Sequence, residues 1–381
     1  MFTTIGCILT RAPRPGGVLK VAWSKVLSFT DPFPYTAAIR AANMQIFPTV
    51  KGEFRAELTQ VTLRKVWMQR FNENLPRVHK GMIRRGRRVF TFLTEHQPEV
   101  YNRGRLLSLG EICAENFEVQ HARTSGDFRM EGISLGPEDF GAACKTIVGC
   151  ELDTERRERF IQPNPDLMER LLKLHELAGS FAKNAPELLE IPGVVQALEE
   201  QLVHVLVRCL ADGIVSTRIN NTLRHKIIIA RFEEFLEANP NTPLYLTDVC
   251  AAVGAAERTL RAACEEHVGM GPIRYLTLRR MHLARRALER AVPSMTRVTQ
   301  IATDHGFWEL GRFSVAYRTL FGEMPSETLN RPPSDSRGVS HRPKPEQYLI
   351  NRGRILNRRQ SAKRLSVRTL RSERSTPAKC Q

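Results

Sequence analysis

The spacing of glycine and apolar residues between positions 298 and 327 constrains the fold of this chain more than any other feature. An apolar pair at 301–302 can lie on one face of a short helix, and Gly306 follows it. Glycine takes the left-handed conformation at a helix end without steric cost. A second helix over residues 309–321 would bury Phe313 and Tyr317. The pattern predicts a helix-turn-helix unit with the structural residues Ile301, Ala302, Gly306, Phe307, Phe313, Tyr317, Phe321, Gly322 and Pro325.

The same plan appears upstream. Gly254 would end a first helix, residues 256–268 would form a second helix that buries Leu260, and Gly269 would end it. A helix over residues 272–290 would join the two units. At 1.5 Å per residue it spans roughly 28 Å, close to the ~34 Å turn of B-DNA. We therefore expect two helices, 256–268 and 309–321, that can enter successive major grooves on one face of a duplex.

This arrangement resembles the DNA-binding domain of AraC/XylS-type transcription regulators, over about residues 224–330. The run from Ile301 to Ser326 carries most of the resemblance, and Arg258-Thr259-Leu260 also fits the family pattern. The resemblance implies that the exposed faces of both second helices contact the bases of double-stranded DNA. By position, the DNA-binding residues would be Arg258, Thr259, Arg261, Ala262, Glu309, Leu310, Gly311, Arg312, Val315 and Arg318.

The sequence leaves open whether the first unit reads bases and what the arginines of the two second helices contact. Ala256, Ala262 and Cys264 stand where the family often has Ser, Arg and Phe. These departures remove a helix cap of ~1 kcal/mol, a charge that faces DNA and some core volume. The arginines of the two second helices could each donate two hydrogen bonds to guanine, or contact phosphates, or remain solvated surface charges.

The net charge of +17 is concentrated at the two ends of the chain. Residues 331–381 hold 14 Lys and Arg against 3 Asp and Glu, a net charge of +11. Residues 1–28 carry +4, which leaves +2 for residues 29–330. We expect a disordered leader over 1–28 and a basic disordered tail over 331–381. Specific DNA binding must then depend on where individual arginines lie and on helix N-termini that point at phosphates.

The N-terminal half reads as short strands followed by helices. Strand candidates lie between residues 54 and 135, and apolar residues three and four apart indicate helices over 167–181 and 194–210. We expect an α+β chain with two domains, for which the family resemblance implies a cupin-like β-barrel at the N-terminal end. The expected segments are a β-rich sensor or dimerisation domain at 29–213, with helices from about 138, a linker at 214–223 and the double helix-turn-helix domain at 224–330.

The aromatic residues of this half have two interpretations, an apolar ligand pocket or a simple core: Trp67, Phe90, Phe92, Phe117 and Phe128. His79, His96 and His121 lack the His-x-His pair of metal-binding cupins, and the eight cysteines include no Cys-x-x-Cys pair. We therefore expect no metal and no cofactor. No apolar run approaches the ~20 residues of a membrane span, and we expect a cytoplasmic protein.

These features together predict a sequence-specific transcription regulator with no catalytic site. Its partners would be promoter DNA, RNA polymerase if it is an activator, and a small-molecule effector or a second copy in a homodimer. An enzyme with an accessory helix-turn-helix domain, such as a DNA-repair alkyltransferase, would need a reactive cysteine, but Cys113 and Cys144 lie in Ile-Cys-Ala and Ala-Cys-Lys segments. The remaining alternative is a non-specific nucleic-acid binder that acts through the tail at 331–381.

Overall fold

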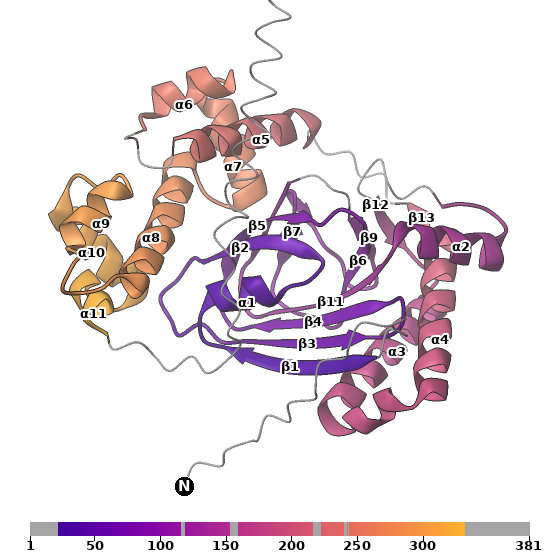
Figure 1. Ribbon diagram of the computed structural model, residues 1–381. Coiled ribbons are helices and arrows are strands. Elements are labelled where there is room, and N and C mark those ends of the chain that lie inside the picture. The colour runs from indigo at the N-terminus through magenta and orange to yellow at the C-terminus, as the bar shows by residue number, and fades with distance from the viewer. Residues whose placement is uncertain are drawn as a thin grey trace, which may run out of the picture. The chain divides into compact units, whose positions relative to one another are not determined.

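A computed structural model describes residues 22–115, 119–152, 159–215, 222–239, 242 and 244–331 of the chain (Figure 1). The described residues up to Asn330 belong to one compact unit. Its N-terminal half combines strands with helices, and the described elements of its C-terminal half are helices. The expected α+β class with a β-rich N-terminal domain and a helical C-terminal domain is confirmed. The tail predicted at 331–381 and most of the predicted leader lie outside the described residues.

Two antiparallel sheets build the N-terminal half. The larger sheet has eight strands in the order β1-β3-β4-β11-β6-β9-β12-β13, and the smaller has five in the order β2-β5-β10-β7-β8. Their strands are β1 (Trp23–Phe29), β2 (Ala42–Pro48), β3 (Ala56–Thr62), β4 (Trp67–Glu73), β5 (Arg77–Ile83), β6 (Arg88–Leu93), β7 (Val100–Asn102), β8 (Arg105–Leu106), β9 (Ile112–Glu115), β10 (Gln120–Thr124), β11 (Phe128–Leu135), β12 (Arg159–Gln162) and β13 (Ile214–Val215).

The sheets correct two expectations from the sequence. The disordered leader predicted through residue 28 is wrong for its last residues, because β1 begins at Trp23 and pairs along its whole length with β3. No strand pair in the described residues joins the two sheets, so they do not close and the term barrel describes them only loosely. They pack face to face instead, with Tyr35, Ile46, Leu58 and Phe71 in the core between them.

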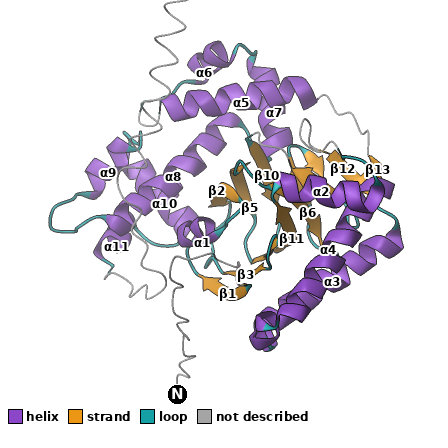
Figure 2. Ribbon diagram, turned by 45° about the vertical axis from the view of Figure 1, so that its right-hand side comes forward, coloured by secondary structure: helices purple, strands orange, loops and turns teal. Residues whose placement is uncertain are grey.

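Helices cover the outer face of the larger sheet (Figure 2). They are α2 (Pro137–Val148), α3 (Pro165–Asn184), a short 3-10 helix (Pro186–Glu190) and α4 (Pro192–Asp212), while α1 (Pro32–Ala38) lies near the start of the chain. Proline opens each of these helices, where its missing N–H costs no hydrogen bond. The predicted stripes of α3 and α4 point inward, with Leu171, Ala178, Leu202 and Val205 buried against the sheet.

The described residues of the C-terminal half form helices and the turns that connect them. The helices are α5 (Thr222–Ala238), α6 (Leu246–Val253), α7 (Glu257–Val268), α8 (Pro272–Arg290), α9 (Val298–Asp304), α10 (Leu310–Phe321) and α11 (Pro325–Asn330). None of the helices in the described part of the chain is long and apolar enough to cross a membrane. Short α6, α9 and α10 could not be stable alone, because isolated helices of this length are marginal in water.

The strand β2 touches this helical half through its last residues. Phe47 is buried in the same core as residues of α5, α7 and α8. His282 of α8 is buried beside it and donates from Nε2 to the carbonyl oxygen of Pro48 at 2.9 Å. Burial lowers the pKa of His282 to about 4, although the hydrogen bond to Pro48 acts in the opposite direction. The buried position of His282 therefore favours a neutral imidazole.

We predict that His282→Gln makes the protein less sensitive to acid. The unfolded chain binds a proton near the ordinary histidine pKa of 6.5, whereas the folded chain resists it until about 4. The contribution of neutral His282 to the free energy of unfolding is thus fully present above pH 6.5 and is lost as the pH falls toward 4. Glutamine keeps a donor for Pro48 but does not titrate. Melting temperatures measured between those pH values should fall less steeply than in the wild type, whereas exposed His96→Gln should keep the wild-type slope.

Candidate nucleic-acid interface

The first helix-turn-helix unit consists of α6, a turn at Gly254 and α7. Gly254 has φ +69° and its N–H donates to the carbonyl oxygens of Cys250 and Ala251, so the turn closes helix α6. Leu260 and Cys264 of α7 are fully buried against Val249. Ala256 stands at the N-cap of α7 without a side-chain hydrogen bond, so this helix lacks the cap that a Ser would supply.

The second unit consists of α9, a turn at Gly306 and α10. Gly306 has φ +77°, and Phe307 packs on Phe313 with ring centroids 4.9 Å apart. Tyr317 is fully buried, and its hydroxyl lies 2.8 Å from the hydroxyl of Thr328 on α11. Gly322 ends α10 with φ +81°. Glu309 caps the helix rather than belonging to it, so α10 begins at Leu310.

Helix α8 holds the two units together through its two halves. Tyr275 and Leu276 belong to the core of the first unit, whereas Met281, Ala284 and Leu288 belong to the core of the second. Because one continuous helix of 19 residues enters both cores, it fixes the separation and the relative rotation of α7 and α10. The predicted connecting helix over 272–290 matches α8 residue for residue.

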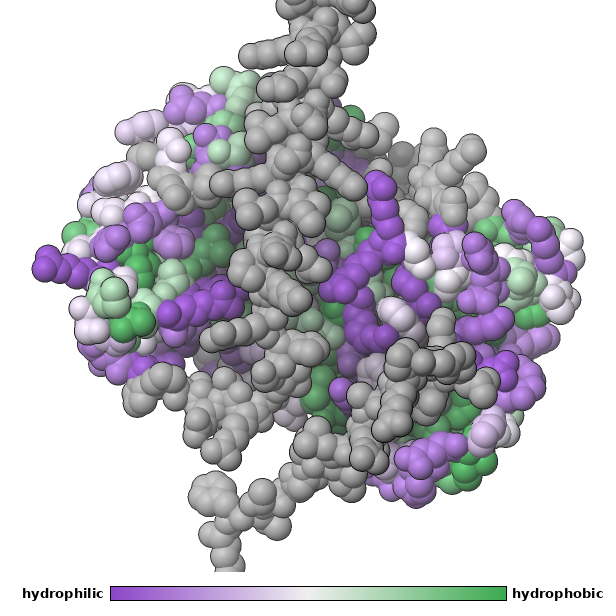
Figure 3. Space-filling model, in the orientation of Figure 1, coloured by the Kyte–Doolittle hydropathy of each residue, from purple (hydrophilic) through white to green (hydrophobic). Residues whose placement is uncertain are grey.

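The residues predicted to contact DNA lie on the outer faces of α7 and α10. Arg258, Arg261 and Ala262 are exposed, and Thr259 is half-buried. On α10, Val315 is 69% exposed, and Leu310 is 36% exposed. Figure 3 shows hydrophobic and hydrophilic side chains side by side over the end of the molecule that carries α9 and α10. Exposed with them in this unit are Glu309, Gly311, Arg312 and Arg318.

Two of these arginines are paired with acidic residues three or four positions earlier in the chain. Arg261 binds Glu257 at 2.7 Å, one helical turn away, and Arg312 binds Glu309 at 2.8 Å. The four side chains are between 53% and 85% exposed. Such surface pairs contribute roughly 0–1 kcal/mol, so a phosphate or a guanine edge can replace the carboxylate at little cost.

A buried ionic cluster joins the smaller sheet to the helical half. Glu233 of α5 accepts hydrogen bonds from Nε2 of His121 at 2.9 Å, from Nζ of Lys80 at 2.7 Å and from the hydroxyl of Tyr275 at 2.7 Å. Arg279 lies 3.5 Å away. Burial alone would raise the pKa of Glu233, but its hydrogen bond to His121 and the nearby positive charges hold that pKa well below its usual range.

Sequence reasoning missed this cluster. Lys80 and His121 lie on β5 and β10, more than a hundred residues before Glu233 in the chain. No periodicity or motif links positions so far apart, and Glu233 reads in the sequence as one more acidic residue on an amphipathic helix. Only the pairing of β5 with β10 brings His121 opposite Lys80 and makes one binding surface for the carboxylate.

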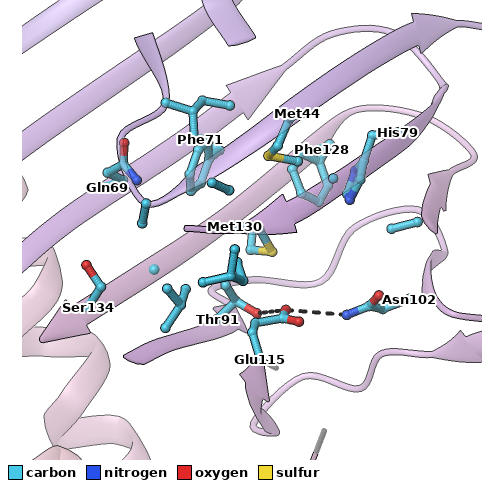
Figure 4. A pocket seen from close by; sticks show the side chains of 18 of the residues that line it. Met44, Gln69, Phe71, His79, Thr91, Asn102, Glu115, Phe128, Met130 and Ser134 are labelled. Atoms are coloured by element: carbon cyan, nitrogen blue, oxygen red, sulfur yellow. Dashed lines mark hydrogen bonds between the residues drawn. The ribbon is translucent and has the colours of Figure 1, made fainter. Parts of the chain in front are cut away.

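A cavity lies between the two sheets (Figure 4). Of the aromatic residues proposed as a pocket lining, Trp67 and Phe128 line it. Phe90 and Phe92 instead belong to the core under α2, α3 and α4, and Phe117 lies outside the described residues. Within the described part of the chain, no group of three His, Cys, Asp or Glu residues could hold a metal ion.

Comparisons with known proteins match the C-terminal half. Residues 249–331 match a helix-turn-helix domain family. The XylDLEGF operon transcriptional activator 2 of Pseudomonas putida is 29% identical over 128 residues, which cover 32% of this chain and 82% of that protein. The probable thc operon regulatory protein of Rhodococcus erythropolis is 39% identical over 100 residues, which cover 26% of this chain but only 30% of that protein.

A solved structure matches a similar share of the chain. The crystal structure of a probable AraC family transcriptional regulator from Rhodopseudomonas palustris is 33% identical and covers 28% of this chain and 98% of that one, with a TM-score of 0.25. The two sequence relatives are named as an operon transcriptional activator and as a probable operon regulatory protein.

We predict that Gly306→Ala destabilises the second unit, whereas Gly311→Ala does not. A Cβ at Gly306 would lie 2.7 Å from Nη1 of Arg280, and the residue would have to keep a positive φ. The left-handed conformation costs an L-residue roughly 1–2 kcal/mol. A Cβ at Gly311 meets open space on a helix, where alanine is favoured over glycine. Thermal or urea melting should show a loss only for Gly306→Ala; equal melting of the two variants would refute this account of the turn.

Proposed function

The chain belongs to the AraC/XylS-type family of helix-turn-helix regulators, and on this premise we propose that it is a sequence-specific DNA-binding regulator of transcription. One observation carries the proposal: α7 and α10 each expose a face with arginines, at opposite ends of the rigid helix α8. A helix of 19 residues spans roughly 28 Å, which is close to the ~34 Å turn of B-DNA. DNA binding, rather than catalysis, is the activity that this arrangement serves.

Base reading would divide between charged and apolar side chains. Arg258, Arg261 and Arg312 have the donor geometry to bind guanine O6 and N7 in the major groove. Leu310 and Val315 offer exposed apolar surface beside Arg312, and such surface fits the methyl group of thymine. We therefore propose that the site read by α10 combines guanine with thymine, whereas the site read by α7 depends mainly on guanine.

Control of DNA binding would come from the N-terminal half. Strand β5 places His79 and Gly81 on the cavity and Lys80 on Glu233. Strand β10 likewise places Ala122 on the cavity and His121 on Glu233. Because successive side chains of a strand point to opposite faces, a small molecule between the sheets would act on the two strands that hold α5.

Other partners follow from the same proposal. The relatives named as activators suggest that this protein also activates transcription, with RNA polymerase as its partner in the cytoplasm. Dimerisation through the N-terminal half would place two readers on one promoter. These assignments rest on the family and on the architecture described above.

An enzymatic alternative would need a reactive thiol, and the buried cysteines do not provide one. Burial raises the pKa of Cys144, and it raises the pKa of Cys209 and Cys264 to about 12. A thiol whose pKa is raised forms less of the nucleophilic thiolate at neutral pH. The cysteines of the described helices therefore act as small apolar core residues.

Selection of binding sites from a randomised duplex library tests the proposed function. We expect the full chain and a chain that ends at residue 331 to select the same bipartite site, with its two halves about one DNA turn apart. Loss of all selective binding in the shortened chain would overturn the proposal, because binding would then belong to the basic tail.

We predict that Arg312→Ala weakens binding to the selected site by about 1–3 kcal/mol and relaxes the base preference at one position. The reason is the loss of a bidentate contact to one base. Arg55→Ala, which removes an exposed arginine of the N-terminal half, serves as the control and should bind like the wild type. An unchanged base profile for Arg312→Ala in the same selection would remove Arg312 from the base-reading residues.

A further inference from the structure

The cavity between the sheets has mostly apolar walls with a polar group at one end. The space inside it that the centre of a water-sized sphere can occupy is about 70 Å³. Met44, Phe71, Phe128 and Met130 supply much of the apolar wall, as Figure 4 shows. Small-molecule sites in proteins combine such walls with a few polar groups that fix the orientation of the ligand. The polar groups of this cavity should therefore indicate which ligand it takes.

Glu115 supplies a hydrogen-bond acceptor at the polar end. Its Oε1 accepts from the hydroxyl of Thr91 at 2.9 Å and lies 3.4 Å from Nδ2 of Asn102 (Figure 4). These contacts hold the carboxyl group in place between strands of the two sheets. Its Oε2 is buried and has no hydrogen-bond partner among the described residues. A buried acceptor without a partner costs roughly 1–3 kcal/mol, which a ligand with a donor would recover.

Arg77, the one arginine among the described residues of the cavity wall, does not offset this carboxyl group. Nε and Nη2 of Arg77 donate to the two carboxylate oxygens of Glu73, and Nη1 contacts Nδ1 of His79. Its flat face lies 4.2 Å from the ring of Phe128. Burial lowers the pKa of His79 well below its usual value, so that imidazole adds no positive charge. An anionic ligand would therefore face the acceptor oxygen of Glu115. The guanidinium of Arg77 is already bound to Glu73 and would not be available to bind that anion.

We propose that the cavity binds a small molecule with an apolar body and one hydrogen-bond donor or positive charge, which Glu115 receives, and that it excludes carboxylic acids. This inference rests on the proposed control of DNA binding by an effector and names the chemical class of that effector. Amines, phenols and alcohols on an aromatic or aliphatic frame belong to the class. The apolar wall selects the frame, and Oε2 of Glu115 selects the donor.

Three probes that share a phenyl ring and differ in their polar end test the proposal. They are 2-phenylethylamine, 2-phenylethanol and phenylacetate, each titrated calorimetrically into the full-length protein at neutral pH. We expect the amine to bind most tightly, the alcohol more weakly and phenylacetate not at all at concentrations that saturate with the amine. The ranking in the wild-type protein needs no variant, so it remains informative even where a substitution disturbs folding.

Two matched variants assign the preference to Glu115. Glu115→Gln replaces the acceptor oxygen and should weaken binding of the amine by roughly tenfold or more, because hydrogen bonds to charged groups contribute about 1.5–3 kcal/mol. Binding of the alcohol should change less. Glu53→Gln changes a side chain that is 82% exposed on the same domain and should leave both affinities as they are. Melting curves of both variants show whether each is folded.

The outcomes separate this proposal from the proposed function. Tighter binding of phenylacetate than of the amine, an unchanged preference in folded Glu115→Gln, or failure of all three probes to bind would overturn the ligand class. DNA site selection with the same protein preparations tests the regulator itself. If the protein still selects a DNA site but the probes bind in the wrong order, only the ligand class is refuted. If the protein selects no DNA site, the regulator is refuted, and the probe affinities alone decide which ligand class the cavity binds.

Discussion

The buried carboxylate of Glu233 is the interaction on which the relation between the two halves depends. A carboxylate removed from water is costly unless charged and hydrogen-bonding partners surround it. Lys80 and His121 come from the smaller sheet, and Tyr275 comes from α8, so its partners belong to both halves. Separation of the halves would leave a buried charge without its partners or would require water to enter. The cluster therefore favours one geometry over near alternatives.

Helix α8 extends this constraint to the residues that we propose contact DNA. Its first half shares the core that contains Tyr275 and Phe47, and its second half supports α10. A rigid helix transmits a change of position from one end to the other because its hydrogen-bond ladder resists bending. A shift of β5 or β10 would thus act on α5 and α8 together. Under the proposed control by an effector, α7 and α10 would need no direct contact with that effector to respond to it.

Much of the helical half was predictable because its signals are local. Gly254, Gly306 and Gly322 each follow a helix and have a positive φ. Because glycine adopts a positive φ without steric cost, the residue type itself indicates these helix ends. Apolar spacing likewise placed Phe313 and Tyr317 inside. Ala316 precedes Tyr317 on the same helix but is exposed. In the N-terminal half, alternation identified strands but could not say which of Phe90 and Phe128 faces the cavity.

The sequence by itself determined the two helix-turn-helix units, since glycine turns and helical periodicity act within a few residues of one another. Only the tertiary structure decided where the carboxyl group of Glu115 lies and that Lys80 and His121 bind Glu233. It also decided that the residues from Trp23 onward join a sheet. Those features depend on strand register and on contacts between residues far apart in the chain. A shift of the strand pairing by one residue would turn each side chain to the other face of the sheet, and no local sequence pattern determines which register forms.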